Sequence, residues 1–169
     1  QDCYGHFPAG SRRTDRRALG GAVALVFYAE EPAWTTQTPA PDPFAEPVLV
    51  DAFALPWSAA GVDPAFGGAG HHCKPLGSAS DGRPATLLVA TPPHLHPPGW
   101  SAPQELHACA EELFLLSGDL LSHAGQMCSG AYTFRPAGIA HGPYGSRGGC
   151  LALLRTHGGP LAVAFSRHE

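Results

Sequence analysis

Positive charge is scarce in this sequence of 169 residues. Lysine occurs once, as Lys74, and lysine and arginine together number 10 against 14 aspartates and glutamates, which leaves a formal net charge of -4 at pH 7. A nucleic-acid interface needs a basic surface that neutralises phosphates. We therefore expect no nucleic-acid partner.

Long apolar runs are also missing. The segment 18–28 follows several arginines and resembles the start of a secretory or twin-arginine signal. It is shorter than the roughly 20 apolar residues needed to cross a bilayer, and it continues into Glu30 and Glu31. We expect neither a membrane span nor a membrane partner.

Cysteine does not follow a disulfide or zinc-site pattern. The five cysteines include no C-x-x-C pair, and their odd number argues against a complete disulfide framework. Free thiols indicate a reducing compartment, so we expect a cytoplasmic protein. Because free cysteine is among the most buried residue types, we expect these side chains to act as small buried apolar groups.

What the sequence does contain indicates a globular β protein. Hydrophobic residues make up 44% and charged residues 14%, a balance that favours a packed core over disorder. The 21 glycines and 18 prolines separate short β-prone segments such as PVLV, ATLLVA, EELFLLSG and CLALLR. No long amphipathic helix lies between them. The fold class is therefore predicted to be all-β, as a small sandwich or barrel.

An internal repeat indicates the domain organisation. Residues 4–27 align without a gap with residues 132–155, and the Tyr, Pro-Ala-Gly and Gly-Gly positions match. We interpret residues 1–30 as the last strands of a partial first module, 31–47 as a Pro-rich linker and 48–169 as a complete domain. The apolar edge of such a fragment needs a partner, so we expect a homodimer.

Two stretches carry residues suited to metal binding. Alternate side chains of an extended chain share a face, so Glu105, His107 and Glu111 would lie on one face. The turn at 136–138 would bring His141 back toward them. Imidazole and carboxylate are ligands for Fe(II), Mn(II), Ni(II) and Zn(II). From the residues alone, a hydrogen-bonded histidine beside solvated glutamates remains the alternative.

The spacing of these residues resembles the two motifs of the cupin superfamily. The first motif, G-(X)5-H-X-H-(X)3,4-E-(X)6-G, is matched in spacing by Gly99, Glu105-Leu106-His107, Glu111 and Gly118. The second, G-(X)5-P-X-G-(X)2-H-(X)3-N, is matched by Gly130, Pro136-Ala137-Gly138 and His141, and Gly145 stands where the motif ends in asparagine. The stretches LPW, PPGW, EELFLLSGDL and PAGIAHGP resemble the ChrR-like or acetylacetone-cleaving-like branch of small cupins.

This resemblance implies a double-stranded β-helix, or jelly-roll, barrel over about residues 48–165. It places His107, Glu111 and His141 at metal-ligand positions, and the repeat extends it to a bicupin-like chain. Arg13 falls where His141 falls in the repeat. Because a guanidinium does not bind metal, the first module is not expected to hold one.

The main departure from the motif is Glu105, which stands where the family has histidine. As a ligand it would complete a shell of two histidines and two carboxylates, which favours harder ions such as Mn(II) or Fe(II). As a non-ligand it would lie beside the substrate as a catalytic general base. The site could also hold no metal. Fe(II) is the ion expected first, with Mn, Ni and Zn as alternatives.

Other histidines lie outside the motif register. His94 and His96 form an H-X-H pair between prolines and are expected at the surface or the barrel rim, with substitute metal ligation as the alternative. His71 and His72 are adjacent, so they would point to opposite sides of an extended chain. We expect them to have surface or hydrogen-bonding roles.

The resemblance implies a metal-dependent oxidoreductase of the dioxygenase type, acting on a small oxygenated organic molecule in the barrel. Two alternatives remain because cupins host many activities. One is a non-catalytic module that senses a small ligand. The other is a metal-dependent isomerase or cyclase.

Overall fold

The computed structural model describes residues 3–8, 11, 17–28, 31, 48–58, 70–78, 84–97 and 103–166. Two compact units can be separated by their internal contacts: Gln1–Tyr4 with Val50–Glu169, and Gly5–Leu49. The candidate site lies within the first of these units, which is described by itself below.

All regular structure in the described residues is β-strand, so the prediction of an all-β fold is confirmed. The strands are β1 (Cys3–His6), β2 (Val48–Asp51), β3 (His72–Ser78), β4 (Pro84–Thr91), β5 (Glu105–Leu106), β6 (Ala110–Ser122), β7 (Gly125–Cys128), β8 (Tyr132–Arg135), β9 (Cys150–His157) and β10 (Ala164–Phe165). Within the same residues, no helix has the length and apolar character required to cross a bilayer.

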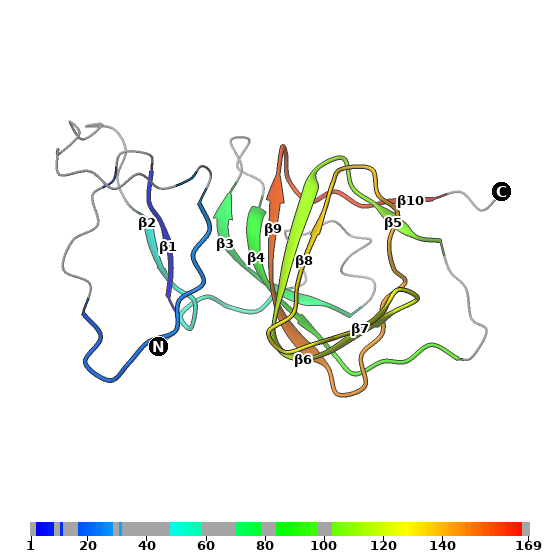
Figure 1. Cartoon of the computed structure of the whole chain (residues 1–169), viewed down its shortest axis with the longest axis horizontal. Coiled ribbons are helices and arrows are strands. Elements are labelled where there is room, and N and C mark those ends of the chain that lie inside the picture. Colours follow the sequence, from blue (N-terminus) through cyan, green and yellow to red (C-terminus); the bar gives the residue numbers. More distant parts are fainter. Residues whose placement is uncertain are drawn as a thin grey trace. The chain divides into compact units, whose positions relative to one another are not determined.

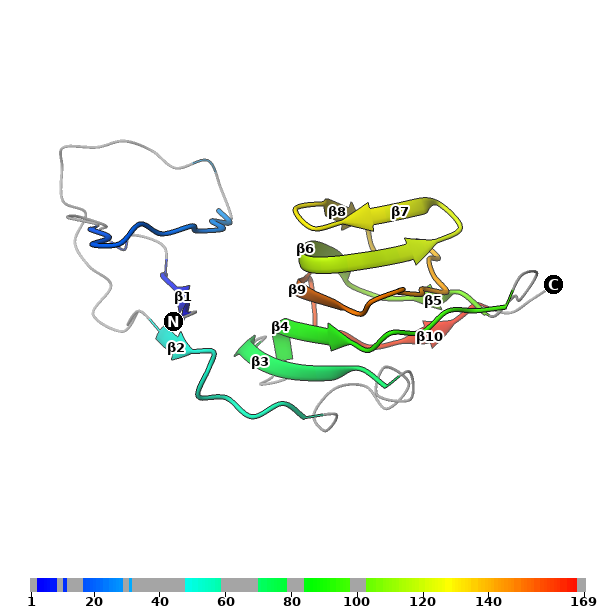
Figure 2. The same ribbon diagram turned by 90° about the horizontal axis from the view of Figure 1, so that it is seen from below.

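The main sheet is antiparallel, with strand order β3-β4-β9-β6-β7. β8 pairs with the first half of β6, and β7 pairs with its second half. Figure 2 shows β3, β4, β9 and β6 side by side in this order. A second, smaller sheet joins β5 to β10 (Figure 1). The long strand β6 therefore connects most of the barrel wall.

The core contains side chains from the covered face of the main sheet. Side chains of β6 and β9 alternate between more and less buried positions, as expected when one sheet face is covered. The buried apolar residues form two clusters, one of Cys73, Leu87, Val89, Leu154 and Leu161, the other of Leu113, Leu115, Leu120 and Ala152. Burying each leucine side chain contributes about 1.5–3 kcal/mol.

One glycine of the first motif has a clear structural reason. Gly118 has a φ of +82°, and a Cβ placed on it would lie 2.1 Å from the carbonyl oxygen of Gly149 and 2.8 Å from the Cα of Cys150. Any side chain would collide with the backbone of the neighbouring β9. Only glycine allows β6 and β9 to remain paired at this point.

The expectation of one continuous strand through Glu105 and Glu111 was wrong. β5 ends at Leu106, residues 108–109 form a bend, and β6 begins at Ala110. The chain turns a corner here from the small sheet to the main sheet. The alternation of buried side chains nevertheless continues across the bend at His107, Cys109 and Glu111, so the expected shared face is retained.

The repeat is only partly reflected in regular structure. β1 corresponds to β8 at the repeat offset, but residues 22–28, the described counterparts of β9, form no strand. β9 is a strand because β4 and β6 supply ladders on both of its edges. β1 pairs instead with β2. Arg13 and most of the 31–47 segment lie outside the described residues.

The cysteines divide by environment. Cys73 and Cys109 are buried, as expected for small apolar groups, and burial raises the pKa of both thiols. Cys3 and Cys128 are exposed, which corrects the expectation that all five would be buried. Both belong to short strands, where alternate side chains face away from a core.

Candidate metal centre

Backbone hydrogen bonds bring the two motifs together. The N–H of Glu105 donates to the carbonyl oxygen of His141 at 2.8 Å, and the N–H of His141 donates to the carbonyl oxygen of Glu105 at 3.0 Å. Gly138, which has a φ of +76°, donates its N–H to the carbonyl oxygen of His107 at 2.9 Å. The turn at 136–138 therefore returns the chain against β5, as the spacing predicted.

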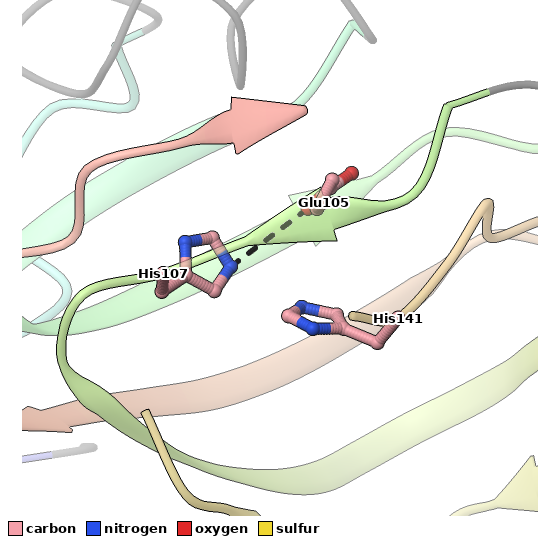
Figure 3. Close-up of side chains that lie close together, drawn as sticks. All are labelled: Glu105, His107 and His141. Carbon is pink, nitrogen blue, oxygen red and sulfur yellow. Dashed lines mark ion pairs between the residues drawn. The ribbon is translucent and has the colours of Figure 1, made fainter. Parts of the chain in front are cut away.

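Three side chains converge at this point from two segments, Glu105 and His107 from β5 and the residue after it, and His141 from the chain after β8 (Figure 3). One potential ligand atom from each of Glu105, His107 and His141 lies within 4.8 Å of the others. Glu111 is close as well, because its Oε2 lies 3.4 Å from Nε2 of His107 and 4.0 Å from Nε2 of His141. Donors held about 2.0–2.2 Å from one ion lie roughly 3.0–4.4 Å apart, so small side-chain adjustments suffice to bind one.

Both imidazoles are oriented by main-chain carbonyls. Nδ1 of His107 lies 2.8 Å from the carbonyl oxygen of Ala162, and Nδ1 of His141 lies 2.9 Å from that of Ile139. Since a carbonyl only accepts hydrogen bonds, both Nδ1 atoms carry the hydrogen when the rings are neutral. Both Nε2 atoms then present lone pairs to the centre, the arrangement that supports metal-ligating histidines in proteins.

One atom of the centre has no hydrogen-bond partner. Nε2 of His107 is buried and is the only buried side-chain nitrogen or oxygen without one among the described residues. Leaving such a group unsatisfied costs about 1–3 kcal/mol, and native proteins rarely do so without a reason. A divalent ion bound by imidazole and carboxylate would satisfy this atom, so the residues present fit a metal.

Arg135 is a further member of the centre that the spacing rule did not identify. Its Nη1 donates to Oε1 of Glu111, whose side chain is 5% exposed, and β6 and β8 pair these two residues directly. Oε2 of Glu111 remains toward the histidines. Arg135 could have been identified by assuming that the two motif strands pair antiparallel, because this pairing places the residue before Pro136 opposite Glu111.

Arg135 changes the charge balance expected for the site. Two carboxylates would neutralise a divalent ion, but the guanidinium beside Glu111 adds one positive charge. The centre with its ion then carries the same net charge as three imidazoles with one carboxylate. Arg135 therefore offsets the additional negative charge that Glu105 would bring to the ion.

Burial perturbs the proton affinities of the centre. Desolvation raises the pKa of Glu105, and the charge of Glu111 adds to this, while His107 and Arg135 act against it. Desolvation lowers the pKa of His141, so its ring stays neutral at pH 7. A neutral imidazole is a suitable metal ligand. A carboxylate with an elevated pKa is a more effective base than an exposed glutamate.

The centre opens into a cavity of about 260 Å³ within the barrel. Glu105, Glu111 and His141 line one part of it, and Leu113, Leu120 and Leu154 contribute an apolar floor. The volume is slightly below the range of about 300–1,000 Å³ typical of small-molecule sites. A compact ligand could therefore reach the metal donors while its apolar part contacts the leucines.

Tyr144 also lines this cavity, and the sequence analysis did not identify it. Its ring centroid lies 5.9 Å from that of His141, and the guanidinium of Arg135 lies 5.5 Å from the tyrosine ring. Burial raises the pKa of Tyr144 far above its ordinary value. The phenol therefore stays protonated at neutral pH and can serve as a hydrogen-bond donor.

The remaining predicted histidines lie in different places. His94 and His96 line the cavity, consistent with the rim position expected, and His71 joins them there. Their ring nitrogens contact main-chain and hydroxyl oxygens, so these histidines do not join the Glu105 group of donors. His72 is exposed, as predicted. Gly99, the first residue of the motif, lies outside the described residues.

Comparison with known proteins supports the fold. A candidate dioxygenase from Nostoc punctiforme has a TM-score of 0.60 and 19% identity, covering 75% of this chain and 44% of that structure. The polyketide cyclase RemF from Streptomyces resistomycificus has a TM-score of 0.50 and 18% identity, covering 71% and 85%. An acetylacetone dioxygenase from Acinetobacter johnsonii has a TM-score of 0.43 and 19% identity, covering 57% and 72%.

At these identities the first two structures show a shared fold and nothing further. The chain spans less than half the length of the Nostoc protein. No curated protein sequence matches the chain. The model of the ChrR cupin-like domain matches residues 45–159, a range that contains both motifs and every donor of the candidate centre. The fold is therefore the all-β cupin fold that the motifs implied, and the chain belongs to the ChrR cupin-like domain family.

Proposed function

We propose that this domain is a metal-dependent oxidoreductase of the dioxygenase type, which acts on a small oxygenated organic molecule in the barrel cavity. The observation that carries the proposal is the convergence of Glu105, Glu111 and His141 on Nε2 of His107, which makes no hydrogen bond, next to a cavity. Fe(II) is the proposed ion, with Mn(II), Ni(II) and Zn(II) as alternatives, because imidazole and carboxylate donors accept all of them.

The residues of the chain have distinct proposed roles. His107 and His141 bind the ion through Nε2, because their Nδ1 atoms are anchored to carbonyls. Glu111 binds through Oε2, because Arg135 holds its Oε1. When bound, the ion would supply Lewis acidity toward substrate oxygens and, as Fe(II), the redox chemistry needed for reaction with O2.

Glu105 has two possible roles in this proposal. Its donor oxygen is close enough to His107 and His141 to act as a fourth ligand. Its elevated pKa also suits a base that removes a proton from a substrate hydroxyl or an activated C–H group. The apolar floor would keep water away from the reacting part of the substrate.

A metal-dependent cyclase is the second candidate, and it needs no O2. It is a candidate because RemF, a polyketide cyclase, has the same fold over 85% of its length. A non-catalytic ligand-sensing module would use the same cavity without turnover. Fold does not select among these activities.

Metal analysis tests the shared part of the proposal. Protein purified without chelators is expected to contain close to one equivalent of a divalent transition metal, and His141→Ala protein is expected to contain little. Near-zero metal in both proteins, also after incubation with Fe(II), would rule out the metal centre. O2 consumption by the Fe(II)-loaded protein during a small-molecule screen then separates the dioxygenase from the cyclase, which would convert substrate without consuming O2.

A further inference from the structure

Tyr144 lines the cavity, and its main chain is held by several hydrogen bonds. Its carbonyl oxygen lies 2.9 Å from Nε2 of His94 and 2.7 Å from Nε2 of His96. The next residue, Gly145, exchanges two backbone hydrogen bonds with Leu121, at 2.7 and 2.9 Å. The position of Tyr144 in the cavity wall is therefore fixed by contacts with two other segments of the chain.

The ring of Tyr144 contacts both the metal centre and the core. Its centroid lies 5.9 Å from that of His141, and the guanidinium carbon of Arg135 lies 5.5 Å from the ring. The side chain also packs against the apolar cluster that contains Leu113 and Leu120. These contacts on the ring leave its hydroxyl as the part of the side chain without an assigned role.

The hydroxyl of Tyr144 makes no hydrogen bond to any group in the part of the chain that the structure describes. Desolvation is the main cause of its raised pKa, so the phenol oxygen lies where little water reaches it. The charges of Arg135, Glu111 and Glu105 also act on this pKa, as expected of groups close to the phenol. A donor near the metal centre is thus left for a molecule that enters the cavity.

The charge of the centre indicates which kind of oxygen this donor would meet. With a divalent ion bound, the carboxylates of Glu105 and Glu111 and the guanidinium of Arg135 leave one net positive charge. A monoanion would neutralise it. Hydrogen bonds to an ionised oxygen are also roughly twice as strong as those between neutral groups.

The lining of the cavity favours a molecule that enters uncharged. Among its described residues are two carboxylates but no lysine or arginine, so a molecule that is already anionic in water would find no permanent cation apart from the ion. A neutral enol or phenol can enter and ionise beside the ion, passing its proton to water, because a bound cation favours the ionised form of a nearby hydroxyl.

We propose that Tyr144 contacts the substrate, and that its hydroxyl donates a hydrogen bond to the ionised oxygen of a compact enolate or phenolate held at the metal centre. The apolar part of this molecule would lie on the leucine floor of the cavity. This inference rests on the proposed metal-dependent function and adds the residue that recognises the ionised form of the substrate.

Two ligands of different charge test the contact. Maltol, a hydroxypyrone, binds metal ions as a monoanion through two oxygens, whereas 1-methylimidazole binds as a neutral molecule through one nitrogen and offers no other hydrogen-bonding group. Each is titrated into the Co(II)-loaded full chain, and the absorption bands of the cobalt give the dissociation constant. We expect Tyr144→Phe to weaken maltol binding by about ten- to a hundredfold, the range for one lost hydrogen bond to a charged group, and to leave 1-methylimidazole binding unchanged.

Tyr132→Phe is the matched control. Tyr132 is an exposed tyrosine of β8 that donates its hydroxyl to Glu112, so the same atom is removed away from the cavity. This variant should bind both ligands as the parent does. The Co(II) affinity and the thermal unfolding midpoint of both variants are measured first, and the Tyr144→Phe values are expected to match those of the parent.

The outcomes separate this inference from the proposed function. Parent-like maltol binding by Tyr144→Phe would overturn the contact and leave the metal centre intact. An equal loss of both ligands, or a Tyr144→Phe protein with weakened Co(II) binding or a lowered unfolding midpoint, would assign Tyr144 to the structure of the cavity and would also overturn the contact. Failure of both ligands to bind the Co(II)-loaded parent would overturn the contact together with the proposed function.

Discussion

The two faces of β6 carry the same kinds of charged residue in different surroundings. On the inner face, Glu111 contacts Arg135 and lies near two histidines. On the outer face, the adjacent Glu112 contacts Arg155, His157 and the hydroxyl of Tyr132. Composition alone therefore does not distinguish a metal centre from a surface network of ion pairs.

The difference lies in burial and in hydrogen-bond satisfaction. On the outer face, the side chain of His157 is 46% exposed, and its Nε2 contacts Glu112 at 2.7 Å. The inner His107 is 3% exposed in its side chain, and its Nε2 makes no hydrogen bond. An exposed pair contributes little to stability, whereas a buried nitrogen that makes no hydrogen bond fits the position of a metal ligand.

The largest difference between the two faces is expected in the loss of stability on substitution of Arg135 or Arg155. Arg135→Met leaves the buried carboxylate of Glu111 without its cation, and the metal-free protein should lose about 3–5 kcal/mol of unfolding free energy. Arg155→Met removes a more exposed partner of Glu112, and we expect a loss of about 0–1 kcal/mol. Urea denaturation at pH 7 measures both. Similar losses in the two variants would contradict the contrast between faces.

The second largest difference is expected in Co(II) affinity on substitution of His107 or His157. His107→Ala removes an anchored ligand, and Co(II) affinity is expected to fall by about 100-fold or more, equivalent to about 2.7 kcal/mol. His157→Ala on the outer face should bind Co(II) as the parent does. Titration of each metal-free protein with Co(II) gives the affinities. Parent-like affinity of His107→Ala would remove this residue from the metal shell.

Glu105→His tests whether residue 105 is a metal ligand. Carboxylate donors suit Mn(II) and imidazole donors suit Ni(II), so the variant should shift the ratio of Ni(II) to Mn(II) affinity by about tenfold toward nickel if residue 105 is a ligand. Competition titrations with the two ions provide the ratio. An unchanged ratio would assign Glu105 to the role of a base beside the substrate.

The smallest expected effect is the pH dependence of the outer network. Partial burial opposes ionisation of Glu112, but hydrogen bonds from His157 and Tyr132 and the charge of Arg155 outweigh it and lower the pKa. The folded state therefore holds fewer protons on this group than the unfolded state, and its stabilisation is present above the unfolded pKa of about 4.3 and lost as pH falls. Glu112→Gln should be less stable than the parent by under about 1 kcal/mol at pH 7.

That difference should close as the solution is acidified toward pH 3. Thermal or urea unfolding of parent and Glu112→Gln at pH 7, 5 and 3.5 provides the comparison. A gap that widens with acid would mean that the outer network does not favour the ionised carboxylate.

Several features of this protein could be predicted from local patterns. The spacing of glycine, proline and the candidate ligands carried the family resemblance that implied the fold. The turn at 136–138 predicted the approach of His141 to Glu105, because turn residues act over a few positions. Gly118 and Gly138 illustrate this, since both adopt a positive φ that the motif requires. The same local reasoning failed at residues 107–109, where the chain bends between two sheets. It also failed for residues 22–28, because strand formation depends on a partner strand.

The sequence by itself determined the β class, the motif register and the four candidate donors, because these depend on short-range spacing and residue chemistry. Only the tertiary structure decided the contacts between distant segments. Strand pairing placed Arg135 against Glu111, carbonyls of residues 139 and 162 oriented the two histidines, and His71, His94 and His96 came together in the cavity. These contacts arise from the register of strands far apart in the chain, which residue spacing within one segment does not encode.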